Sequence, residues 1–193
     1  MAGIISPYPT IQQPSASDTS FTTGEGVFGR LLGSGSLQLT TQVVSFSYFT
    51  AQRTETVAYV TTFSNSTAMT GATYAGVGVY TVDSSGNLTQ VATTGDVSST
   101  IWANTFTTYA TAFTASFTKV AGQRYAVGML AVASGAPKVQ AQAPAGGALT
   151  ALPSIITSLA AQSTLPASVA VGSLGTTTYF QMPQAILSPT TTP

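Results

Sequence analysis

The chain has 193 residues with no cysteine and no histidine, and its five acidic and five basic side chains give a formal net charge of zero. That length suits one domain with a real core, and a hydrophobic fraction of 44% excludes a chain that is disordered throughout. Charged residues make up 5% of the chain, against about 25% in a typical soluble domain, and they form no basic block. The sequence therefore predicts neither nucleic acid nor an anionic membrane surface as a partner. Every apolar run is also too short for insertion into a membrane.

Serine and threonine replace the missing charges and make up roughly three residues in ten, far above ordinary usage. Such a surface is polar but uncharged, and a net charge near zero favours association. We therefore expect a protein whose working state is packed against neighbours. A Thr-rich adhesive or secreted domain is the alternative.

Residues 1–35 differ from the rest of the chain, because they combine prolines in "SPYPTIQQPSASDTS" with glycines in "GEGVFGRLLGSGS" and show no sustained periodicity. This pattern predicts an extended arm, with a disordered tail as the alternative. The arm has several apolar side chains that favour docking on a partner or a neighbouring subunit: Ile4, Ile5, Tyr8, Ile11, Phe21, Phe28, Leu31 and Leu32.

Residues 36–188 show the period of two that is typical of strands, with β-branched and aromatic residues between turn residues. Strands are expected within 37–50, 55–64, 72–82, 87–94, 106–118, 123–134, 167–174 and 176–182. In the second of these, Val57, Tyr59, Thr61 and Phe63 are expected to share one face. The stretch 123–134 is apolar on both faces, as in a central strand.

Two segments depart from this pattern. Residues 134–148 are expected to form a loop-like crossing, and Pro153 is placed to open a short helix within 149–162. Residues 189–193 form a polar tail. Together these elements predict an all-β protein, an antiparallel β-sandwich of the jelly-roll type with an extended N-terminal arm.

The chain lacks the side chains that most catalysis requires. Without histidine or cysteine there is no common general base and no usual zinc ligand. No GxSxG or phosphate-binding Gly-rich motif occurs, and few carboxylates remain to form a hydrolytic pair. The sequence therefore predicts a protein that is not an enzyme and that uses no cofactor and no metal.

The stretch Asp83-Ser84-Ser85-Gly86-Asn87 has oxygen-bearing side chains that suit either a cation site or a turn. A calcium loop supplies several carboxylates, whereas here the next acid is Asp96. Asp and Asn favour turns and Gly permits positive φ, so a hairpin turn is predicted. Asp83 and Asn87 remain candidates for a surface contact at the hairpin tip.

Three other residues are candidates for special roles. Arg53 and Glu55 are two residues apart on a predicted strand and can pair as a solvated edge pair. Trp102, the single tryptophan, is either a surface platform for a sugar or partner or a partly buried lid on the core.

Four stretches occur in an order that suggests a family. These are "VSFSYFTAQRTETVAYV", "GVGVYTVDSSGNLTQVATT", "FTKVAGQRYAVGMLAV" and "STLPASVAVGSL". Over residues 37–187 the chain resembles the small jelly-roll minor tail and virion decoration proteins of tailed phages that infect actinobacteria. The resemblance implies a virion component, trimeric and without a catalytic motif, and it leaves the attachment of the N-terminal arm open.

The leading hypothesis is thus a non-enzymatic bacteriophage structural protein on the exterior of the virion. In one form it is a minor tail, tail-tip or fibre protein that contacts a host cell-surface glycan. In the other it is a capsid decoration protein that stabilises the phage head. Its partners are then other copies of itself, as a homotrimer, and other phage structural proteins. A carbohydrate-binding module with no structural role is a third hypothesis.

Overall fold

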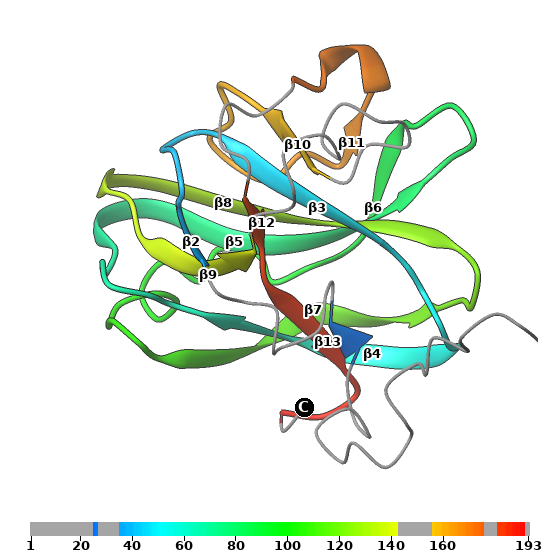
Figure 1. The fold of residues 1–193 in the computed structure, drawn as a ribbon, viewed down its shortest axis with the longest axis horizontal. Coiled ribbons are helices and arrows are strands. Elements are labelled where there is room, and N and C mark those ends of the chain that lie inside the picture. The colour runs from blue at the N-terminus through cyan, green and yellow to red at the C-terminus, as the bar shows by residue number, and fades with distance from the viewer. Residues whose placement is uncertain (1–24, 27–34, 143–155, 176–180, 192–193) are drawn as a thin grey trace, which may run out of the picture.

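Strands form nearly all the regular structure of the computed structural model, which describes residues 25–26, 35–142, 156–175 and 181–191. Every strand pair is antiparallel, and the two larger sheets pack face to face as a sandwich (Figure 1). The predicted all-β sandwich is therefore confirmed. Its jelly-roll connectivity stays a prediction.

The larger sheet has six strands. Their order across the sheet is β10 (Ile156–Leu159), β3 (Val44–Thr50), β8 (Arg124–Gly135), β5 (Thr70–Val82), β6 (Leu88–Thr93) and β11 (Ser168–Val169). The two longest strands of this sheet, β5 and β8, pair at its centre. Seven consecutive residues of β8 are buried, which confirms the prediction of a central strand there.

The facing sheet has four strands in the order β1 (Glu25–Gly26), β13 (Ala185–Ser188), β4 (Glu55–Phe63) and β7 (Thr108–Lys119). A smaller three-stranded sheet joins β12 (Met182–Pro183), β9 (Lys138–Gln142) and β2 (Gly35–Gln38). The described residues also include a single 3-10 turn, η4 (Val171–Ser173).

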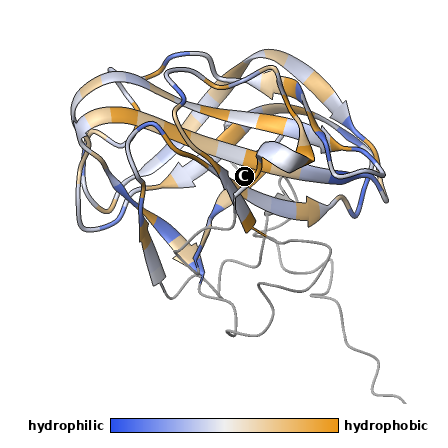
Figure 2. Cartoon of the chain, turned by 90° about the horizontal axis from the view of Figure 1, so that it is seen from above, coloured by the Kyte–Doolittle hydropathy of each residue, from blue (hydrophilic) through white to orange (hydrophobic). Residues whose placement is uncertain are grey.

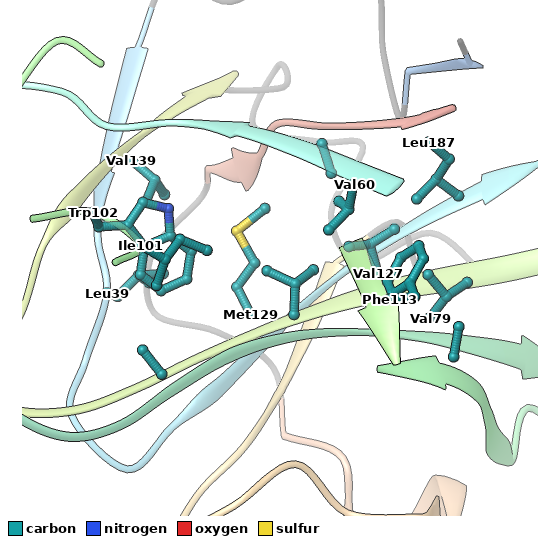
Figure 3. Packing of buried hydrophobic residues seen from close by; sticks show 14 of the residues in the cluster. Leu39, Val60, Val79, Ile101, Trp102, Phe113, Val127, Met129, Val139 and Leu187 are labelled. Carbon is teal, nitrogen blue, oxygen red and sulfur yellow. The ribbon is translucent and has the colours of Figure 1, made fainter. Parts of the chain in front are cut away.

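The main core lies between the two larger sheets. Figure 3 shows Trp102 close to Ile101, Leu39 and Val139 at one side of this core, with Met129 between that group and the remaining labelled side chains. Apolar residues alternate with polar ones along the strands, and hydrophilic residues gather in the loops (Figure 2). The period of two in the sequence thus reflects one face turned to this core.

A second core covers the other face of the six-stranded sheet. Phe46 and Tyr80 meet edge to face there, with ring centroids 5.3 Å apart. Residues 156–175 lie over these rings through Val169, Leu165 and Leu174. Tyr48 and Thr157 share a buried hydrogen bond of 2.8 Å that ties this layer to β3.

Several predicted elements were wrong. The single strand expected within 37–50 is two strands in different sheets, β2 and β3, separated by a turn in which Gln42 has a φ of 61°. The expected crossing contains strand β9, and Ile156–Leu159 is strand β10 instead of part of a helix. Both strands pair with segments roughly a hundred residues distant, so tertiary pairing overrides the weak local signal.

The expected common face of β4 was also wrong. A register shift between Val57 and Tyr59 breaks the alternation, so Val57 and Val60 are both fully buried in the core. On the facing strand β7, the residues between Ala112 and Phe117 bulge out of the ladder. Such bulges bend the edge of a sheet and re-aim its side chains.

Candidate functional site

Trp102 is a core residue. Its side chain is 0% exposed, which rules out the surface contact considered for it and confirms the alternative of burial. The indole Nε1 donates a hydrogen bond of 3.0 Å to Oγ1 of Thr62, which is also fully buried. The backbone φ of Trp102 is 55°, a left-handed conformation that bulky residues rarely adopt.

The Asp83–Asn87 stretch is a hairpin turn between β5 and β6, as predicted. Asp83 Oδ1 accepts hydrogen bonds from the backbone N–H groups of Ser85 at 2.8 Å and Asn87 at 2.9 Å. Asp83 Oδ2 accepts one from the Asn87 side chain at 2.8 Å, and Gly86 has the positive φ of 89° that the turn requires. The hydrogen bond from the Asn87 side chain, followed by those from the backbone, lowers the pKa of Asp83 below its ordinary value. Both oxygens of the Asp83 carboxylate thus accept hydrogen bonds within the turn.

Asn87 also joins this turn to the segment that covers the six-stranded sheet. Its side-chain oxygen accepts a hydrogen bond of 3.0 Å from the backbone N–H of Val171 in η4. Asp83 is exposed, so the pair retains a surface position, but the polar atoms of both side chains are already engaged. These contacts are those of a structural turn.

Four charged residues gather at this end of the sandwich. Glu55 bridges Lys119 at 2.9 Å and Arg53 at 3.0 Å, and the Lys119 side chain is fully buried. The Arg124 guanidinium lies 4.9 Å from the ring centroid of Tyr48. The expected Arg53–Glu55 pair therefore forms, but as part of a network that includes a buried lysine.

The opposite end of the sandwich carries an exposed aromatic residue that the sequence analysis missed. Strand β5 runs between the two ends, so they are separated by roughly 40 Å along its thirteen residues. Phe106 is 76% exposed and has a φ of 50°. A left-handed backbone at such a residue costs about 1–3 kcal/mol and persists only where the surrounding structure imposes it.

The surroundings of Phe106 impose that conformation. We call residues 103–106 the Phe106 loop; all four are exposed. On one side Met69 N–H donates to the Trp102 carbonyl at 2.8 Å. On the other, Ser64 N–H donates to the Thr107 carbonyl and Thr107 N–H donates to the Ser64 side-chain Oγ, both at 2.9 Å. The Tyr109 hydroxyl bonds both backbone groups of Asn104, at 2.7 and 3.2 Å.

A signal for Phe106 was present in the sequence. The predicted strand at 106–118 turns Tyr109 and Phe113 inward, which places Phe106 with the threonines and alanines of the outward face. A large aromatic residue on the polar face of an alternating strand indicates either a covered surface or a contact site.

Strand β7 exposes an uncharged strip of small side chains. Seven of its twelve residues are exposed, and none is larger than threonine: Thr108, Ala110, Ala112, Thr114, Ala115, Ser116 and Thr118. We call these residues the β7 strip. They lie on an edge strand, which pairs with β4 alone among the described strands.

The eight apolar residues predicted to anchor the arm all lie outside the described residues. Within residues 1–35, the structure describes the pairing of Glu25 and Gly26 with Leu187 and Ile186 of β13, and the start of β2 at Gly35. Among the described residues no group of three or more Asp, Glu, His or Cys side chains is placed to hold a metal ion. In that same part of the chain, no helix has the length and apolar character needed to span a membrane.

No protein-family model matches the chain, and no curated protein matches it.

Proposed function

We propose that the protein is a non-enzymatic structural component of a bacteriophage particle, of the minor-tail type. In this proposal copies of the chain associate on the exterior of the virion and present their loops to the host surface. The sequence resemblance suggests the virion, and the β7 strip is the observation that carries the assembly.

The β7 strip suits close packing against another copy of the chain. Alanine, serine and threonine lose little side-chain entropy when they are buried, and their small size lets backbones approach. None of the seven residues is charged, so burying them carries no cost for removing water from an ion. The whole chain has a net charge of zero, which removes long-range repulsion between copies.

A homotrimer fits this arrangement. In a ring of three, the strip of each subunit meets a different surface of the next subunit, and the contact closes on itself. The exposed strand then contacts protein instead of remaining an open sheet edge, which is prone to uncontrolled pairing. The N-terminal arm joins the ring to other structural proteins of the particle.

Charge inserted into the strip tests the proposal. Ser116→Glu and Ala112→Glu each place a carboxylate in the β7 strip of every subunit. Both positions are exposed, so no core side chain changes. We expect sedimentation velocity to show a trimer for the wild type and a monomer for each variant, with an unchanged circular dichroism spectrum. Ser84→Glu, at the exposed hairpin tip, is the matched control and should stay trimeric. A monomeric wild type, or variants that associate as well as it does, would contradict the assembly.

A further inference from the structure

We propose that the Phe106 loop is a binding site for a neutral sugar. Phe106 supplies an apolar face for the C–H groups of the ring, and the side chains of Asn104 and Thr105 supply hydrogen bonds to its hydroxyls. This inference rests on the proposed function for its biological setting, since it names the ligand class of a host contact.

The exposure of Phe106 is the first observation. Among the exposed large hydrophobic side chains of the described residues it is the most exposed, at 76%, against 36–50% for three valines. Its backbone φ of 50° adds strain that a glycine would avoid. An exposed aromatic residue held in an unfavourable backbone conformation is a candidate for a contact site.

The second observation is that the loop is preorganised. Trp102, which opens it, is fully buried and hydrogen-bonded to Thr62 on β4. Phe106 N–H donates to the Asn65 carbonyl at 3.1 Å, and the Tyr109 hydroxyl hydrogen-bonds to the backbone of Asn104. A ligand therefore meets a surface that needs little further ordering, which favours binding.

The polar groups beside Phe106 favour a sugar over an apolar protein pocket. The Asn104 carboxamide and the Thr105 hydroxyl form no hydrogen bond within the described part of the chain, and both residues are exposed. An apolar pocket that enclosed Phe106 would strip water from these groups without replacing it. Sugar hydroxyls, in contrast, both donate to and accept from an amide and a hydroxyl.

The lack of charge in the loop favours a neutral sugar. Residues 103–107 are Ala, Asn, Thr, Phe and Thr. Lys138 lies at the same end of the sandwich, where its backbone carbonyl accepts a hydrogen bond of 2.7 Å from Asn65 N–H. An acidic sugar would depend on the ammonium group of Lys138, so Lys138→Ala separates the two ligand types.

The test is an NMR titration of the isolated wild-type protein with tetrasaccharides of glucose, galactose, mannose and N-acetylglucosamine, and with tetragalacturonate as the acidic probe. We expect at least one neutral probe to shift the amide signals of residues 103–107 and of Ser66. Phe106→Ala should weaken that binding about tenfold or more, Asn104→Ala should weaken it, and Phe106→Trp should retain it. Val171→Ala, which alters an exposed apolar side chain at the other end, is the control and should bind as the wild type does.

Three outcomes would overturn the inference. They are no shift with any neutral probe, equal binding by Phe106→Ala, or binding confined to tetragalacturonate and lost in Lys138→Ala. These measurements use no virus particle, so their failure is distinguishable from failure of the assembly or of the virion location.

Discussion

The indole N–H of Trp102 donates a 3.0 Å hydrogen bond to the hydroxyl of Thr62, and both side chains are fully buried between the two sheets. Trp102 precedes the Phe106 loop and Thr62 lies on β4. One buried contact therefore fixes the start of an exposed loop to the core of the sandwich. The sole tryptophan of the chain serves the candidate site by positioning it.

Thr62→Val removes the acceptor of this hydrogen bond with almost no change in shape. We expect the free energy of unfolding to fall by about 1–3 kcal/mol, because the buried indole N–H is left without a partner. Chemical denaturation measures the change. Thr56→Val, at an exposed position of the same strand, is the control and should lie within about 0.5 kcal/mol of the wild type. Equal stability of Thr62→Val and Thr56→Val would show that the bond contributes nothing.

Phe106→Gly tests the strain at the exposed aromatic. Glycine adopts a φ of 50° freely. The free energy of unfolding of Phe106→Gly should therefore be about 1 kcal/mol higher than that of Phe106→Ala. Thermal and chemical unfolding of the two variants give the comparison. If both variants are equally stable, the left-handed backbone at this position carries no strain.

The sequence predicted much of this fold but little of its surface. Strands β4 to β8 were predicted because long runs alternate, with turn residues such as Asp83 to Asn87 between them. Strands β9 and β10 were missed because Ala-, Pro- and Gly-rich surroundings give no periodic signal, and because their partners are distant along the chain. Trp102 was considered for a surface contact and Phe106 was missed, because the sequence does not show which of two nearby aromatics faces the core. The conformation of the turn decides this, and composition alone does not.

Glu55→Gln tests the buried charge network. This change leaves the fully buried Lys119 ammonium without its carboxylate, and we expect a loss of roughly 3 kcal/mol. Lys119→Met should cost less, because Glu55 keeps its bridge to Arg53 and a methionine fills the space. Chemical denaturation of the two variants checks the order. A larger loss for Lys119→Met than for Glu55→Gln would contradict it.

The hairpin turn predicts a dependence on pH. Hydrogen bonds from Asn87 and the backbone hold the pKa of Asp83 below its unfolded value of 3.8. The stabilisation is therefore present above that value and is lost as the pH falls through the lower, folded pKa. Burial raises the pKa of Asp96, but hydrogen bonds from Ser98 and Ala75 outweigh it and lower the pKa overall, so its contribution has the same sign.

Melting temperatures measured from neutral pH to below about pH 3 test this dependence. We expect the wild type to lose stability over the acidic part of the range and the Asp83→Asn, Asp96→Asn double variant to lose less. An NMR titration of the Asp83 carboxyl should give a pKa below its ordinary value. Identical acid profiles for the two proteins would contradict the assignment.

Deletion of residues 1–24 tests the role of the arm. The deletion keeps Glu25 and Gly26, which pair with β13, so the sandwich should fold with an unchanged circular dichroism spectrum. We expect the truncated protein to be absent from assembled particles, because five of the eight predicted anchors are removed. Its incorporation at the wild-type level would show that the arm is not the attachment.

The central claim is that the protein is part of the exterior of a phage particle. Immunogold labelling of particles purified from the phage that carries the gene, with antibody against residues 36–188, tests this claim most directly. The account predicts gold at the tail or its tip, and gold over the head would assign the protein to capsid decoration instead. Particles that carry no label, and contain no peptide of the chain by mass spectrometry, would contradict the claim.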